Sequence, residues 1–240
     1  MDKSDFSQHI SQQYNEDLQD ILSGVMAMGG LVEEQLSDAV SALVDGDSQL
    51  GEKVVTSDAK VNDAEVALDE ACTHVLARRQ PAASDLRLII AVIKTINDLE
   101  RIGDEAERVG RMGLHLMEAD RGKVPMEDIR NLGNLVRDMV HGALDAFARM
   151  DPEQAVRVAQ RDIQADSTYD AITHELLRRM MEDSSIVPRI MDVIWSCRAL
   201  ERIGDRARNI CEYVVYFVKG TDVRHTSFEH MAQEATGDGH

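Results

Sequence analysis

The feature that most constrains the fold of this chain is an internal repeat, because it requires two copies of one structural unit. The pentapeptide Glu-Arg-Ile-Gly-Asp occurs at Glu100–Asp104 and again at Glu201–Asp205, each time after a leucine. Ala106 recurs as Ala207 at the same shift of 101 residues. A repeat of this length within 240 residues predicts two similar halves.

Apolar residues spaced three and four apart predict six long helices, three in each half. No stretch shows strand alternation of useful length, and all four prolines lie near expected helix boundaries. The first helix is expected to end at about Asp45. The other five are expected to run from about Gly51 to Arg79, from Asp85 to about Glu118, from Met126 to Arg149, from Pro152 to about Asp183, and from Val187 to Lys219.

Short connections between consecutive helices favour antiparallel neighbours. The sequence therefore predicts an all-α fold of two tandem three-helix bundles. The first bundle is expected at residues 1–119, a charged connector at 120–125 and the second bundle at 126–220. Residues 221–240 lose the helical periodicity and are expected to form a mobile tail.

Charge and composition argue against several classes of function. A net charge of −18 would repel nucleic acid and anionic lipid, whereas it suits divalent cations or a basic patch on a partner protein. The polar first residues predict no secretory signal, and the longest clean aliphatic run, Leu88–Ile93, is too short to span a bilayer. Three cysteines without zinc-site spacing predict reduced thiols, so a cytoplasmic protein is expected.

Acidic residues recur in pairs four residues apart, and the pairs correspond at the 101-residue shift. Two acids at this spacing share a helix face and repel by a few tenths of a kcal/mol, so their repetition favours a compensating cation. A solvated acidic face is the simpler alternative. The candidate metal ligands are Glu65, Asp69, Glu100, Asp104, Asp166, Asp170, Glu201 and Asp205.

The surroundings of these pairs bear on the metal hypothesis. Asp58, Asn62 and Asp162 extend the acidic stripes of the second and fifth helices, whereas the third acid of the third helix, Glu107, is replaced by Arg208 in the sixth. Gly103 and Gly204 predict close approach of a neighbouring helix or a ligand, because glycine inside a helix costs about 1 kcal/mol relative to alanine. Oxygen ligands without His or Cys suit Mg²⁺, Ca²⁺, Mn²⁺ or iron, and carboxylates also accept zinc.

No pattern in the sequence indicates catalysis. A Walker loop, a dinucleotide glycine fingerprint and a GxSxG nucleophile elbow are all lacking from the sequence. His174-Glu175 begins like a zinc-protease HExxH motif, but Arg178 stands where the second histidine is needed. The chain is therefore not expected to be an enzyme.

The doubled Glu-Arg-Ile-Gly-Asp resembles the PhoU family of phosphate-uptake regulators. So do Met28-Gly29-Gly30-Leu31 and the segment Arg-Gln-Pro-Ala-Ala-Ser-Asp-Leu-Arg at residues 79–87. With the six-helix order, the resemblance covers about residues 9–219. It implies tandem three-helix bundles whose Glu/Asp-x-x-x-Asp motifs bind metal ions in some members. Carried over by position, those motifs are the eight acids named above.

The resemblance also implies a function. Such proteins repress the phosphate-starvation response by linking the high-affinity phosphate ABC transporter to a sensor histidine kinase. The partners expected here are the transporter's ATPase subunit, that kinase and a second copy in a homodimer, with Mg, Mn, Fe or Zn as the bound metal. The alternative is a helical protein that mainly buffers metal ions. Loss of a regulator would derepress phosphate-starvation genes, whereas loss of a buffer would change cellular metal content.

Overall fold

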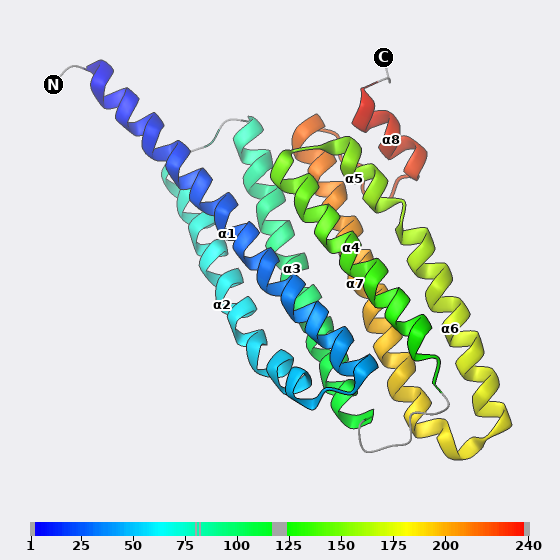
Figure 1. The fold of residues 1–240 in the computed structure, drawn as a ribbon. Coiled ribbons are helices and arrows are strands. Elements are labelled where there is room, and N and C mark those ends of the chain that lie inside the picture. Colours follow the sequence, from blue (N-terminus) through cyan, green and yellow to red (C-terminus); the bar gives the residue numbers. More distant parts are fainter. Residues whose placement is uncertain (1–2, 80, 82, 117–123, 238–240) are drawn as a thin grey trace.

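The structure, a computed structural model, describes residues 3–79, 81, 83–116 and 124–237, and within these ranges it is helical with no strand. Figure 1 shows long helices lying side by side. The elements are α1 (Lys3–Asp45), α2 (Ser48–Arg79), α3 (Ala83–Leu116), α4 (Met126–Arg149), α5 (Pro152–Ala159), α6 (Asp162–Glu182), the 3₁₀ turn η1 (Ser184–Ile186), α7 (Val187–Lys219) and α8 (Phe228–Thr236).

Helices α1, α2 and α3 pack against one another as the first bundle. The turn between α1 and α2 follows from its sequence. Gly46 takes a positive φ of 77°, and the Asp47 carboxylate caps α2 by accepting hydrogen bonds from the backbone N–H groups of Gln49 and Leu50 at 3.0 and 3.1 Å. These short-range signals allow two long helices to reverse direction within two residues.

The second bundle is built on α4, α6 and α7, and its longest helix ends where the sequence predicts. Gly220 takes a φ of 83° after Lys219, and its N–H donates to the carbonyl of Tyr216. The most extensive contact between any two helices joins α3 to α7, so the bundles lie side by side (Figure 1). Their buried apolar side chains form one continuous cluster across both bundles.

The all-α fold, the repeated bundle and most helix bounds are confirmed, but the fifth expected helix is not continuous. It divides into α5 and α6 at Gln160 and Arg161. The Arg161 N–H donates to the carbonyl of Val158, three residues back, which tightens the turn and bends the axis. Figure 1 shows α5 beside α8 and α6 running away from it along the outer side of the bundle. Apolar spacing did not reveal this bend, because both pieces keep the same helical period.

The expected mobile tail is also corrected, since most of it is ordered against the second bundle. Helix α8 packs on α5 and α7 and buries Met231 and Ala235, while Val223 is buried in the segment before it. The hydroxyl of Ser227 caps the helix by accepting from the N–H of His230. The cap and the spacing Phe228, Met231, Ala235 were the available signals. Residues 238–240 lie outside the described part.

The predicted connector, residues 120–125, lies outside the described residues up to position 123, and so does the predicted end of the third helix at Glu118. Val124 and Pro125 lead into α4 through a hydrogen bond from the Met126 N–H to the Val124 carbonyl at 2.9 Å. The domain limits therefore stay predictions. In the described part of the chain, no helix is long and apolar enough to cross a membrane.

Candidate metal-binding carboxylates

The first bundle brings three of its four predicted acids into one electrostatic group. Glu65 lies on α2, and Glu100 and Asp104 lie on α3. Partial burial, followed by repulsion from Asp104 and Glu65, raises the pKa of Glu100. The pKa of Asp104 is raised by desolvation first and then by Asp58, a residue of the α2 stripe. Asp69 is exposed and lines an open groove of about 590 Å³ instead.

In the second bundle the corresponding acids gather between α6 and α7. Burial and then repulsion from Asp205 raise the pKa values of both Asp166 and Glu201. Asp162, only 2 % exposed, joins them, and burial raises its pKa although Arg208 opposes the shift. Asp170 is exposed, like Asp69 in the first bundle. In each bundle, therefore, the structure groups three of the four predicted acids and adds one acid from the stripe beside them.

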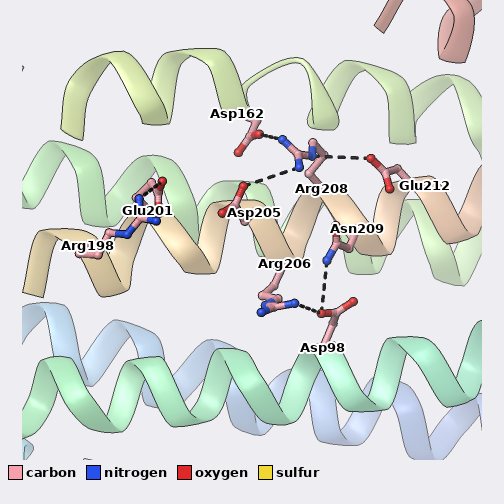
Figure 2. A network of polar contacts seen from close by, with 9 residues as sticks. All are labelled: Asp98, Asp162, Arg198, Glu201, Asp205, Arg206, Arg208, Asn209 and Glu212. Atoms are coloured by element: carbon pink, nitrogen blue, oxygen red, sulfur yellow. Dashed lines mark hydrogen bonds and ion pairs between the residues drawn. The ribbon is translucent and has the colours of Figure 1, made fainter. Parts of the chain in front are cut away.

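Two arginines of α7 neutralise the group in the second bundle (Figure 2). The Arg208 guanidinium donates to the Asp162 carboxylate and lies 3.7 Å from Asp205 and 3.6 Å from Glu212. Arg198 donates to Glu201 at 2.5 Å, and its guanidinium carbon lies 5.8 Å from the centre of the Tyr169 ring. The sequence predicted acids at this place, but it did not predict that arginines from the same helix would fill the space among them.

In the first bundle, neutral amides take the place of arginines. Asp58 accepts hydrogen bonds from the Nε2 of Gln35 and the Nδ2 of Asn62, both at 3.1 Å. The remaining amide oxygens, Gln35 Oε1 and Asn62 Oδ1, are buried without a hydrogen-bond partner. Leaving such an acceptor buried and unpaired costs about 1–3 kcal/mol. Gln35, only 3 % exposed, was not recognised from the sequence, since a single glutamine in an apolar helix carries no motif.

The glycines of the repeat mark corresponding places but fit differently. A β-carbon at Gly103 would stand 3.2 Å from both Gln35 Oε1 and Val61 Cγ1, with Asp58 Oδ1 at 3.6 Å. At Gly204 the nearest atoms, of Asp162, Val136 and Met139, are at 3.5–3.6 Å, an ordinary contact. The expected close approach therefore holds at Gly103 and is wrong at Gly204, where alanine would fit.

The predicted metal ligands have suitable donor atoms, but the structure does not place those atoms around one point. Among the described residues, no three Asp, Glu, His or Cys side chains are placed to hold one metal ion. Buried side-chain oxygens without a hydrogen-bond partner occur in both bundles, at Gln35 and Asn62 in the first and at Asp162 and Glu201 in the second. Carboxylate and amide oxygens are ligands of hard cations such as Mg²⁺, Mn²⁺ and Ca²⁺. The donor atoms of both bundles therefore match such a cation in chemistry.

A further buried carboxylate joins the two bundles, and sequence analysis missed it. Asp98 of α3, 3 % exposed, accepts from Tyr213 Oη at 2.8 Å, Arg206 at 3.2 Å and Asn209 at 3.4 Å, all on α7. Figure 2 shows Arg206 and Asn209 reaching it from the facing helix. Burial raises the pKa of Asp98 against these partners. Because Asp98 corresponds to Ala199 at the repeat shift, the repeat could not reveal it.

Glu212 of α7 lies beside these acids, 3.6 Å from the guanidinium of Arg208. Burial raises its pKa to about 7, although Arg208 and Arg224 oppose the shift. The side chain lines a cavity of about 430 Å³ between α7 and the segment that leads into α8. Val223, Phe228 and Met231, which line this cavity opposite α7, belong to the segment that was expected to be a mobile tail.

Comparison with known proteins gives a consistent result over nearly the whole chain. The family model described as the PhoU domain matches twice, at residues 25–112 and 129–214. The phosphate-specific transport system accessory protein PhoU homolog of Pseudomonas aeruginosa is 49% identical over 234 residues, which cover 98% of this chain and 97% of that protein. The accessory protein PhoU of Escherichia coli is 44% identical over 237 residues, with 99% and 98% covered.

Solved structures agree with the sequence relatives. The crystal structure of PhoU from Pseudomonas aeruginosa superposes with a TM-score of 0.83 at 50% identity, covering 87% of this chain and 100% of that one. The phosphate transport system regulatory protein PhoU from Streptococcus pneumoniae gives a TM-score of 0.81 at 29% identity, with 88% and 99% covered. Sequence and structure therefore give the same assignment over both bundles.

Proposed function

The chain belongs to the PhoU family, and from that membership we propose that it is a negative regulator of the phosphate-starvation response. It acts as a cytoplasmic adaptor without catalytic activity, between the ATPase subunit of the phosphate ABC transporter and a sensor histidine kinase. The observation that carries the proposal is the match over 97–98% of relatives named as accessory proteins of phosphate-specific transport. The net charge of −18 supports docking on basic partner surfaces.

A deletion strain tests this proposal. In medium rich in phosphate, loss of the protein should switch on a reporter driven by a phosphate-starvation promoter, and the wild-type gene should restore repression. Binding of the purified protein to the ATPase subunit and to the kinase, each tested separately, checks the adaptor role. Light scattering on the same preparation measures whether the protein is the expected homodimer. A silent reporter in the deletion strain at high phosphate would refute negative regulation.

Cation binding is the second function that a specific observation favours. The buried, unpartnered oxygens of Gln35 and Asn62 lie beside Asp58, in a group of acids where the charge of Arg101 opposes the raised pKa values of Glu100 and Asp104 without reversing them. A bound divalent or iron cation (Mg, Mn, Fe or Zn) would supply the positive charge this group lacks. If metal buffering were the main role, deletion would alter cellular metal content while the starvation reporter stayed silent.

A further inference from the structure

Exposed apolar side chains are concentrated at the end of the second bundle where η1 joins α6 to α7. Among the described residues, half of the large hydrophobic side chains that are exposed lie here: Leu177 is 46 % exposed, Met181 82 %, Met191 37 % and Trp195 53 %. Figure 1 shows this end of α6 and α7 at the lower right corner of the molecule.

The four side chains form one patch, because they lie on two neighbouring stripes. The two on α6 are four residues apart, as are the two on α7, so each pair shares a helix face. Arg198, one turn after Trp195, has its guanidinium carbon 5.8 Å from the ring centre of Tyr169 on α6. The α7 stripe therefore borders α6. A contiguous exposed apolar patch on a globular protein marks an interaction site.

Beyond the apolar patch, the same two stripes carry opposite charges. On α6, Asp170 and Asp166 come seven and eleven residues before the first apolar residue of the pair, a spacing that keeps them on its face. On α7, Arg198 and Arg202 come seven and eleven residues after the first apolar residue of that pair. All four charged residues are exposed in part or in full. Because the helices are antiparallel, the two acids and the two arginines lie at matching distances from the patch.

The first bundle does not leave its copy of this face open. At the repeat shift Trp195 corresponds to Lys94, whose ammonium lies 5.4 Å from the ring centres of Tyr213 and Tyr216 on α7. Leu76, the counterpart of the first apolar residue on α6, is partly buried against the core. Helix α7 thus covers part of this face in the first bundle, whereas the equivalent face of the second bundle stays exposed.

The charge of the face indicates a second copy of the chain as its occupant. The chain has a net charge of −18, so two copies repel each other over most of their surface. Residues 177–202, in contrast, carry five arginines and four acids, so two copies can meet here without net repulsion. A strongly charged partner gains little from a balanced face. An identical face offers the acidic stripe an arginine stripe and the arginine stripe an acidic one.

We propose that two copies of the chain form a dimer through this α6–α7 face, about a two-fold axis parallel to the helices. This axis places α6 of each copy over α7 of the other, so that four helices pack together between the chains. The apolar patches then meet, and Asp170 and Asp166 of each copy face Arg198 and Arg202 of the other. The inference rests on the homodimer included in the proposed function and names its interface.

The single tryptophan of the chain gives the test a direct readout in the full-length protein. Sedimentation velocity measures the dissociation constant of the dimer, and Trp195 emission is followed over the same concentrations. As the wild-type dimer forms, the emission should shift to shorter wavelength, because the half-exposed indole becomes buried. Met181→Glu should weaken the dimer by about tenfold or more, because it buries a charge in the apolar patch. Val66→Glu, on an exposed residue of α2, is the matched control and should change neither readout.

A charge exchange tests the polar part of the interface separately. Arg198→Asp should weaken the dimer, because the new carboxylate faces Asp170 of the other copy. Adding Asp170→Arg should restore most of the lost affinity, because both charges are then exchanged in both copies. Circular dichroism checks that each variant is folded. Folded variants that all dimerise as tightly as wild type would overturn the proposed interface.

The remaining outcomes separate this inference from the functions it builds on. A wild-type dimer with Trp195 emission independent of concentration, and with affinity unchanged by Met181→Glu, would overturn the interface and leave the homodimer intact. A wild-type monomer at every concentration would overturn both. A monomer whose emission shifts only when the ATPase subunit, the kinase or phosphatidylglycerol vesicles are added would assign the patch to that partner and overturn the proposal. The starvation reporter decides the regulatory role independently of these results.

Discussion

The two bundles share a backbone arrangement. They differ in what compensates the charge of the acid beside the repeated glycine, which is Gly103 in the first bundle and Gly204 in the second. In the first, Asp58 receives hydrogen bonds from two neutral amides, and their oxygens remain unpaired. In the second, Asp162 receives a guanidinium from the same helix that carries the repeated acids. In the second half a guanidinium therefore contacts the inward acid, although Asp162 Oδ1 and Glu201 Oε2 stay buried without a hydrogen bond, whereas in the first half only neutral amides contact it.

This difference shows that a sequence repeat can preserve a backbone arrangement while its charges diverge. Glycine and apolar positions are fixed by the packing of helices, which both bundles need. A charged position needs only a nearby group that balances its charge, and a guanidinium, an amide network or a bound cation can each provide this. A matched pair of acids in two halves thus does not imply matched ligands.

The largest expected effect is the loss of the internal cation of the second bundle. Arg208→Ala leaves Asp162 buried without its partner, and we expect the free energy of unfolding to fall by about 3–5 kcal/mol in urea titrations. Adding Asp162→Asn should recover most of this loss, because the uncompensated charge is then removed. The matched change Arg178→Ala, on an exposed pair, should cost less than about 1 kcal/mol. An Arg208→Ala protein as stable as wild type would contradict the comparison.

A pH dependence is the next largest effect, and near neutral pH we expect it to come from Glu212 in the second bundle. The pKa of Glu212 is about 7 in the folded protein and 4.5 in its reference state. The folded state thus binds the proton more tightly, so stability is highest below pH 4.5 and falls as pH rises through 7. The charged groups around Glu212 are Arg208, Arg224, Asp222 and Asp162.

The measurement compares Glu212→Gln with wild type across this range. The two proteins should be about equally stable at pH 5. At pH 8 the variant should be more stable by on the order of 2–3 kcal/mol, allowing for solvent screening. Position 111, the counterpart in the first bundle, holds arginine, so Arg111→Gln is the matched control and should show no such slope. A constant difference from pH 5 to pH 8 would remove Glu212 as the cause.

Metal addition is expected to stabilise the protein through the first bundle. Mn²⁺ at a hundred times its dissociation constant should raise the free energy of unfolding by about 2.7 kcal/mol. The rise in melting temperature should be lost on chelation and in Asp104→Asn, but kept in Asp205→Asn. Equal losses in both aspartate variants would show that the bundles do not differ in this respect.

The smallest expected effect separates the two glycines. Gly204→Ala should stabilise the protein by about 0.5–1 kcal/mol, because alanine favours the helix and its β-carbon fits at ordinary contact distances. Gly103→Ala should gain none of this, since Gln35 Oε1 and Val61 must shift to accept a β-carbon at 3.2 Å. Thermal unfolding of both variants checks the contrast. Equal gains in stability would show that the side chains around Gly103 can shift without a loss of stability.

The fold was largely predictable because its signals are local. Helical periodicity, Gly46 after α1 and Gly220 after α7 placed most helices within three residues of their observed bounds. The bend at Gln160 and Arg161 was missed because neither residue is a helix breaker and the apolar period continues across it. Helix α8 was missed because it buries only two apolar residues, Met231 and Ala235, and depends on the surface that receives them.

The candidate site was predictable only in part. The acid pairs and the replacement of Glu107 by Arg208 can be read directly from the repeat. The roles of Gln35 and Asp98 cannot, because each depends on contacts with helices far away in sequence. Gln35 reaches α2 at Asp58, and Asp98 reaches α7 at Tyr213, 115 positions later.

By itself, the sequence determined an all-α chain of two repeated bundles with paired acids on two helices of each, because helix period, caps and repeats are properties of neighbouring residues. Only the tertiary structure decided which of those acids is compensated. Charge compensation acts across a few ångströms of space, and the packing of α1, α2 and α3 in one half, and of α4, α6 and α7 in the other, sets which side chains lie within that distance.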